Sequence, residues 1–145
     1  MDERAEAVEA WEALYRAQVA VLRELRAEFP AELSFTEYDV LFNLSRQADR
    51  ALRIRDLNRH LLLTQPSVSR LLDRLAARGL VTKSADPSDA RGTIVTLTEE
   101  GAAAFRRVAV RHGEAIARRM SVLGPDELRA LRVLTRKLRA GAAPH

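Results

Sequence analysis

The chain contains no cysteine, which excludes disulfides, thiolate metal sites and thiol-based redox sensing. Aromatic residues make up only 5% of its 145 residues, and glycine and proline are few. The hydrophobic residues, 47% of the chain, are therefore mostly leucine, valine and alanine. This composition is typical of a single, largely helical domain with short connections.

Long hydrophobic runs are also missing from the sequence. No apolar stretch approaches the roughly 20 residues that are needed to cross a bilayer. The N-terminal residues MDERAEAVEA are acidic, whereas a secretory signal would begin with basic residues. We therefore expect a cytoplasmic protein that does not contact a membrane.

Features of an enzyme are equally scarce. The three histidines, His60, His112 and His145, lie far apart and lack the spacing of metal ligands. The sequence contains neither a glycine-rich phosphate loop nor a serine elbow. We expect no catalytic activity, no metal and no other cofactor.

Positive charge is in modest excess and is unevenly distributed. The formal net charge is +4, and almost all of the basic residues are arginine. Residues 1–33 carry a net charge of −4, whereas residues 34–98 carry +3 and residues 99–145 carry +5. This distribution favours a nucleic-acid partner for the later segments and places the acidic N-terminal segment away from it.

Residues 64–79 are predicted to form an amphipathic helix. Thr64 is a suitable N-cap, Pro66 lies in the first turn, where its missing N–H costs nothing, and Gly79 suits a left-handed C-cap. Apolar residues follow one another at i, i+3, i+4 and i+7. They are Val68, Leu71, Leu72 and Leu75.

The opposite face of this helix is polar. Arginine can bond O6 and N7 of guanine together, and serine or glutamine can bond several base edges, so this face could read a DNA major groove. An ordinary solvated face with surface arginines explains the pattern equally well. The face comprises Gln65, Ser67, Ser69, Arg70, Asp73 and Arg74.

Residues 80–98 are predicted to form a β-hairpin beside that helix. Strand-like segments at 80–85 and 93–98 are separated by turn signals at 86–87 and 91–92. Arg91 lies near the tip, where a narrow minor groove attracts arginine, and Asp89 is placed to orient Arg91 or a neighbouring arginine. The adjacent helix favours DNA contact over a wing-tip salt bridge without a ligand.

Residues 53–62 are predicted to form a shorter helix whose inward side is Ile54, Leu57 and Leu61. With the next helix it makes a helix-turn-helix, in which the first helix crosses the DNA backbone and the second enters the groove. Its candidate phosphate contacts could also serve solubility alone. They are Arg53, Arg55 and Arg59.

Further helices are predicted on both sides of this region. They cover residues 3–29, a segment capped by Thr36, residues 99–122 capped by Thr98, and a last helix that opens at Gly124-Pro125. The long helices carry apolar stripes with alternating spacings of three and four residues. The spacing leaves open whether these stripes pack within one chain or against a second copy.

Taken together, these segments resemble the MarR family of winged helix-turn-helix regulators. The resemblance follows the order of elements along essentially the whole chain. It is carried by FTEYDVLFNLS (35–45), IRDLNRHLLLTQPSVSRLLDRLAARGLV (54–81), DPSDARG (86–92) and LTEEG (97–101). It implies a mainly α fold with a small β-hairpin wing, in which residues 34–98 bind DNA and residues 1–33 and 99–145 form dimerisation helices of one domain.

The resemblance also implies a sequence-specific regulator of transcription. Such a protein binds double-stranded DNA as a homodimer on a pseudopalindromic operator, usually as a repressor that a small molecule releases. The expected base-reading residues are Gln65, Pro66, Ser67, Ser69, Arg70 and Arg74, and the expected phosphate and wing residues are Arg53, Arg55, Thr64, Lys83, Asp89 and Arg91. The expected dimer contacts are Trp11, Leu22, Leu131 and Leu134, and the residues that could border a ligand pocket are Trp11, Tyr15 and His112.

One alternative function is a winged-helix module that binds other proteins without reading DNA. That function predicts an apolar or acidic exposed helix face. The polar residues Ser67, Arg70 and Arg74 argue against it. Salt-dependent binding to duplex DNA separates the two functions.

Overall fold

The computed structural model describes residues 2–61 and 68–142, and its contacts divide the chain into two compact units. We call residues 30–111 the winged unit and residues 2–29 with 112–142 the helical unit. The winged unit thus includes residues 30–33 and 99–111. The sequence analysis had counted these residues among the dimerisation helices.

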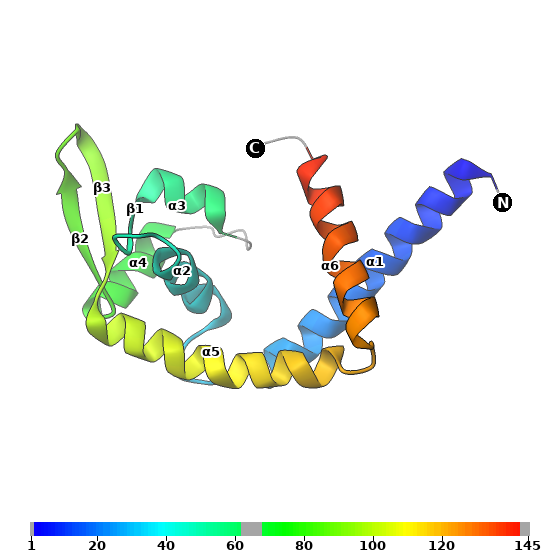
Figure 1. Cartoon of the computed structure of the whole chain (residues 1–145). Helices are drawn as coiled ribbons and strands as arrows, with labels where there is room; N and C mark the ends of the chain where they lie inside the picture. The colour runs from blue at the N-terminus through cyan, green and yellow to red at the C-terminus, as the bar shows by residue number, and fades with distance from the viewer. Residues whose placement is uncertain (1, 62–67, 143–145) are drawn as a thin grey trace. The chain divides into compact units, whose positions relative to one another are not determined.

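The described residues are mostly helical, with one small sheet (Figure 1). The predicted mainly α fold with a β-hairpin is therefore confirmed. The elements, in chain order, are α1 (Glu3–Ala27), α2 (Phe35–Ser45), β1 (Ala51–Arg53), α3 (Ile54–His60), α4 (Val68–Ala77), β2 (Val81–Asp86), β3 (Asp89–Leu97), α5 (Glu99–Met120) and α6 (Pro125–Ala140).

The sheet has three antiparallel strands in the order β1-β3-β2. Val95 in β3 is flanked by Leu52 of β1 and Lys83 of β2. Strand β1 was not predicted, because three residues are too few to show an alternating pattern. Strand β2 has the predicted length but is shifted by one residue, to Val81–Asp86, and β3 begins at Asp89, four residues earlier than predicted. Only Pro87 and Ser88 therefore form the turn.

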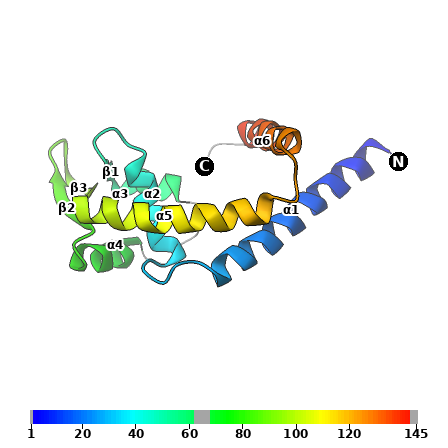
Figure 2. The same ribbon diagram turned by 60° about the horizontal axis from the view of Figure 1, so that its bottom comes forward.

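The core of the winged unit is built mainly from leucines of three helices. Figure 2 shows α2, α3 and α4 gathered with the sheet at the N-terminal end of α5. The innermost side chains are at most 2% exposed. They include Leu41 and Leu44 of α2, Leu57 of α3, Leu71, Leu72 and Leu75 of α4, Val81 and Val95 of the sheet, and Val108 of α5.

Helix α2 begins two residues earlier than predicted. Its N-cap is Ser34 rather than Thr36. The Ser34 hydroxyl accepts the Glu37 N–H at 3.1 Å, and the Glu37 carboxylate accepts the Ser34 N–H at 2.7 Å. This reciprocal capping box satisfies two backbone N–H groups at once.

Helix α5 starts against the C-terminal end of α4. The Thr98 hydroxyl accepts the Gly101 N–H at 2.9 Å, which confirms Thr98 as the cap, and donates to the Gly79 carbonyl at 2.6 Å. The Leu80 carbonyl accepts the Thr98 N–H at 3.1 Å. A side chain at Gly101 would overlap the Leu80 carbonyl, so the close approach of these two segments requires glycine here.

The helical unit buries far less apolar surface than the winged unit. Ion pairs join α1 to α5, with Arg119 at 2.9 Å from Glu24 and Arg118 at 3.3 Å from Glu28. Leu25 is the buried residue of α1, whereas α6 buries none of its residues. None of the described helices combines the length and apolar character that crossing a membrane requires.

The contact at Gly101 makes a prediction about stability. Gly101→Ala should destabilise the protein by about 1–3 kcal/mol, because the added methyl group must displace backbone. Gly113→Ala, in the same helix, is the matched control, because open space surrounds that position. It should stabilise the protein by about 0.5–1 kcal/mol through helix propensity. Urea unfolding of both variants measures the two effects, and equal stability of the two would contradict the packing described here.

Candidate nucleic-acid interface

Helix α4 presents a polar face opposite its leucines. Ser69, Arg70 and Arg74 are exposed, whereas Leu71, Leu72 and Leu75 are buried, as the periodicity predicted. A helix of this width can enter the DNA major groove and bring arginines to base edges. The predicted contacts Thr64, Gln65, Pro66 and Ser67 lie outside the described residues.

The C-terminal end of α4 is closed by Gly79, as predicted. Its φ of 74° is left-handed, the conformation that glycine adopts without strain. The Leu80 N–H donates to the Leu75 carbonyl and the Gly79 N–H donates to the Ala76 carbonyl, both at 3.0 Å. These two bonds form a Schellman motif, which fixes where the chain leaves α4 for the wing.

Arg78, directly before Gly79, anchors the same end of α4 to the segment that precedes α2. Its guanidinium donates to the Glu37 carboxylate at 3.2 Å and to the Glu32 carbonyl at 2.8 Å. Arg107 of α5 donates to the Glu32 carboxylate, and this bond, more than the charge, lowers the pKa of Glu32. The end of α4, the segment around Glu32 and α5 thus meet, although they are distant in sequence.

The turn of the wing is organised by Asp86, whose side chain is only 2% exposed. Its Oδ1 accepts the Ser88 N–H at 2.9 Å and the Ser88 hydroxyl at 2.8 Å. These bonds to Ser88, followed by the charge of Arg53, hold the pKa of Asp86 below its ordinary value of 3.8. Sequence reasoning treated Asp86 only as a turn signal, although an Asp two residues before a serine is also the pattern of an Asx-turn.

Arg53 connects this turn to the start of α3. Its Nε lies 2.6 Å from Asp86 Oδ2, and its Nη2 donates to the Ser88 hydroxyl at 2.7 Å. Glycine at position 92 permits this arrangement, because a Cβ there would lie 3.0 Å from the Cβ of Asp86. The arginine that sequence reasoning assigned to phosphate is therefore engaged within the protein.

A hollow of about 390 Å³ lies beside this ion pair, between α3 and the wing. Arg55 and Asn58 line it from α3, and Arg91 and Thr93 line it from β3. Arg55 and Arg91 are exposed. Arg59 belongs to the same helix but pairs with Asp56 at 3.6 Å.

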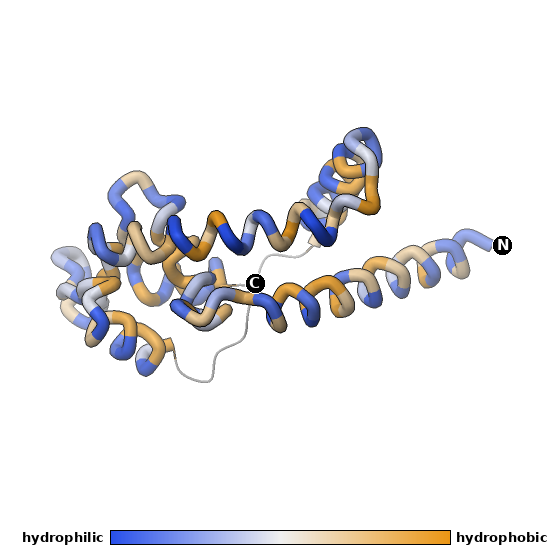
Figure 3. The backbone as a smooth tube through the Cα atoms, turned by 90° about the horizontal axis from the view of Figure 1, so that it is seen from below, coloured by the Kyte–Doolittle hydropathy of each residue, from blue (hydrophilic) through white to orange (hydrophobic). Residues whose placement is uncertain are grey.

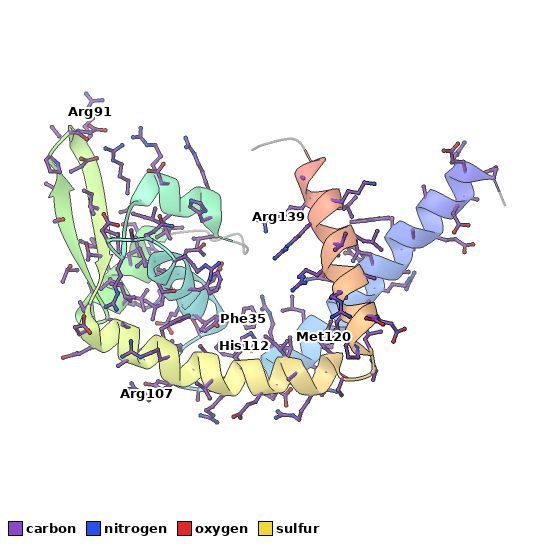
Figure 4. All side chains as sticks on the ribbon, viewed as in Figure 1. Phe35, Arg91, Arg107, His112, Met120 and Arg139 are labelled. Carbon is purple, nitrogen blue, oxygen red and sulfur yellow. The ribbon has the colours of Figure 1, made fainter. Side chains whose placement is uncertain are left out.

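Arg91 lies near the tip of the wing, as predicted (Figure 4). Asp89 braces it through the backbone, because Asp89 Oδ1 accepts the Arg91 N–H at 3.0 Å. A second aspartate thus stabilises the tip in the same way as Asp86. Asp89 is exposed, so the brace faces solvent.

Lys83 of β2 forms an ion pair with Asp73 of α4. The pair joins the wing to α4, and its two residues are ten positions apart in the sequence. Sequence reasoning placed Lys83 among the phosphate contacts and did not anticipate this partner. Its side chain is 29% exposed, compared with 63% for Asp73.

The residues predicted for dimerisation lie in the helical unit. Trp11 and Leu134 are 55% and 63% exposed, and Leu22 and Leu131 are half-buried. Trp11, Leu134 and Leu138 line an open, largely apolar hollow of about 570 Å³ between α1 and α6. Figure 3 shows apolar positions recurring along α1 among polar ones.

Two of the three predicted ligand-pocket residues lie together. The rings of Trp11 and Tyr15 are 5.6 Å apart and border a hollow of about 420 Å³ along α1, with Arg16 and Arg23. His112 does not line this hollow; it is buried, with its ring edge-on to Phe29 at 5.0 Å. Burial lowers the pKa of His112.

The described residues contain no group of three histidine, aspartate or glutamate side chains that could hold a metal ion. The buried acids of the winged unit are committed to other partners. Asp86 binds Ser88 and Arg53, and Glu37 binds Ser34 and Arg78. The groups of the winged unit that a ligand could contact are therefore mainly the exposed guanidinium groups of α3, α4 and the wing.

Comparison with known proteins shows similarity to one family of regulators. Residues 31–92 match the sequence model of the MarR family. YkoM of Bacillus subtilis, an uncharacterised HTH-type transcriptional regulator, is 32% identical over 102 residues, which are 70% of this chain and 65% of YkoM. The chain thus spans slightly less than two thirds of that relative's length.

Solved structures extend the similarity to almost the whole chain. Sco3205, a MarR family transcriptional regulator from Streptomyces coelicolor solved in complex with DNA, is 27% identical with a TM-score of 0.81, covering 97% of this chain and 89% of Sco3205. BpsR of Bordetella bronchiseptica, whose DNA binding is regulated by 6-hydroxynicotinic acid, is 27% identical with a TM-score of 0.77, covering 90% of this chain and 98% of BpsR. In sequence over the winged unit and in fold over almost its whole length, the chain is similar to MarR family transcriptional regulators.

The lowered pKa of Asp86 makes a prediction about pH. A carboxylate whose pKa is lower in the folded state stabilises the fold above its unfolded pKa of about 3.8, and this contribution is lost as pH falls through the folded pKa. The difference in unfolding free energy between the parent and Asp86→Asn should therefore be constant near neutral pH and shrink below about pH 4. Urea unfolding of both proteins at a series of pH values measures it. A difference that grows as the pH falls would contradict the assignment.

Proposed function

We propose that this chain is a sequence-specific DNA-binding regulator of transcription. In this proposal α4 reads the major groove through Arg70 and Arg74, while Arg91 at the wing tip enters the minor groove and Arg55 holds phosphate. We place the protein in the cytoplasm and assign it no catalytic activity. The operator is a pseudopalindrome because each protomer of a dimer reads one half-site.

One observation carries the proposal: the exposed arginine face of α4 lies opposite a fully buried leucine stripe, and the wing beside it carries exposed Arg91 near a braced tip. DNA readers need both an element at base edges and others that hold the backbone in register. The helix and the wing supply these two elements. A module that binds proteins through α4 would instead expose an apolar or acidic face there.

The proposal includes a homodimer formed by the helical unit. No residue of α6 is buried, and Leu134, Leu138 and Val133 are each about 60% exposed. Trp11 of α1 is similarly exposed. Apolar surface of this extent needs a cover, and a second copy in two-fold symmetry provides one with the same residues on both sides.

The proposal also includes release from DNA by a small aromatic anion. The hollow along α1 offers two aromatic rings and two guanidinium groups, which suit a planar ring that carries a carboxylate. The regulation of BpsR by an aromatic acid supports this class of effector. Because the chain lacks cysteine, thiol oxidation is not available as a signal.

DNA reading is tested by separating base contacts from backbone contacts. Arg70→Ala should cost about 1–3 kcal/mol per half-site and relax the preference at one operator position. Arg91→Ala should weaken specific and random DNA more evenly, because the minor groove distinguishes little beyond A·T from G·C. Salt titrations on an operator selected from a random pool and on random duplex measure both effects. If Arg70→Ala binds both duplexes as the parent does, α4 is not the reading helix.

The dimer is tested at Leu134, the most exposed of the apolar residues named above for the interface. Leu134→Asp places a charge on the apolar surface of α6 and should shift the protein from dimer to monomer of about 16.2 kDa. DNA affinity should fall with it, because the two half-sites are then bound separately. Arg106→Ala, an exposed position of the winged unit, is the control and should leave the mass unchanged. Sedimentation measures the mass, and a Leu134→Asp variant that stays dimeric would place the interface elsewhere.

A further inference from the structure

The ion pair between Arg53 and Asp86 joins two elements that the proposed function uses separately. Arg53 is the residue immediately before α3, the first helix of the helix-turn-helix, and Asp86 is the last residue of β2, at the turn of the wing. The three side chains of Arg53, Asp86 and Ser88 are linked by contacts of 2.6 to 2.8 Å. We call this group the wing clasp.

The charges in the wing clasp make Arg53 a poor phosphate ligand. Its Nε and Nη2 already face Asp86 and Ser88, and the Asp86 carboxylate largely neutralises its charge at close range. An arginine attracts phosphate through the charge and N–H groups that remain available. Arg55, which lines the neighbouring hollow from α3, is exposed and better placed for that task.

The wing clasp also determines where the wing tip lies. A two-stranded ribbon bends easily, and pairing with β1 covers only residues 94–96 of β3, short of the tip. Asp86 is buried at the tip end and closes the Ser88 turn with one carboxylate oxygen while its other oxygen meets Arg53. Arg91 follows two residues after Asp89, the partner of Asp86 across the strands, so its backbone position depends on this closure.

We infer that Arg53 and Asp86 are positioning residues, which hold the wing against α3 so that Arg91 reaches the minor groove, and that phosphate contact falls to Arg55. This inference rests on the proposed function. It gives Asp86 an effect opposite in sign to simple electrostatics. Removing an acid near DNA ordinarily strengthens binding, whereas removing this one weakens it.

The experiment is a double-mutant cycle on the full chain, with a duplex selected from a random pool by the parent protein. Asp86→Asn removes the negative charge but nearly keeps the shape of the side chain. We expect it to weaken binding roughly tenfold, the loss of one wing contact. Asp56→Asn is the matched control, because it removes an acid of α3 outside the wing clasp and should leave affinity equal or higher. Arg53→Lys should recover part of what Arg53→Ala loses, since one ammonium cannot reproduce the forked contact.

Two further combinations separate positioning from general loss of folding. In the Asp86→Asn background, Arg91→Ala should cost little more, because the wing no longer places Arg91 on DNA. Arg70→Ala should cost as much in that background as in the parent, because α4 is untouched. If Arg70→Ala also loses its effect, the whole winged unit has been damaged and the positioning role is wrong.

The remaining outcomes are decisive as well. Asp86→Asn binding as tightly as the parent, or Arg91→Ala costing the same in both backgrounds, overturns the inference while the proposed function stands. A parent protein that binds no duplex at low salt overturns the proposed function and the inference together. Anisotropy titrations at several salt concentrations distinguish these cases.

Discussion

Three leucines on one side of α4 determine which way the polar residues on its other side point, and these polar residues are the ones proposed to contact DNA. Leu71, Leu72 and Leu75 are at most 1% exposed, and burial of each is worth about 1.5–3 kcal/mol. Rotation of α4 about its axis would expose them, so the exposed position of Arg70 and Arg74 is set by apolar burial rather than by any contact they make. The end of the helix is fixed separately, by the Schellman motif at Gly79 and by Arg78.

The wing is held by a different kind of force. It has little apolar surface beyond Val81, Val95 and Leu97, and its tip contains none of the buried core residues. Order there comes from aspartates that accept backbone N–H groups two residues ahead and from the ion pair with Arg53. Polar contacts of this kind are individually weak and depend on geometry, so the position of the wing tip rests on a few directional contacts rather than on apolar burial.

The helical unit contrasts with the winged unit in how little it buries. Its helices are joined by exposed ion pairs such as Arg119 with Glu24, which contribute at most about 1 kcal/mol each. Its apolar residues, with Trp11 and Leu134 among them, remain largely exposed. The winged unit can therefore be explained from its own contacts, whereas the helical unit leaves apolar residues exposed, which the proposed dimer would cover.

Sequence determined the elements whose pattern repeats over many residues. The leucine spacing of α4 predicted its buried face, Gly79 predicted the end of the helix, and Thr98 predicted the start of α5, because periodicity and capping are local properties of the chain. Only the tertiary structure decided the partners of Arg53 and Lys83, because an exposed arginine or lysine looks the same in sequence whether it faces a phosphate or an aspartate. Strand β1 and the capping box at Ser34 were missed for a related reason. Three residues are too few to show a period. Ser34 and Thr36 both carry a hydroxyl that can cap a helix, and the sequence pattern alone did not show which of them caps α2.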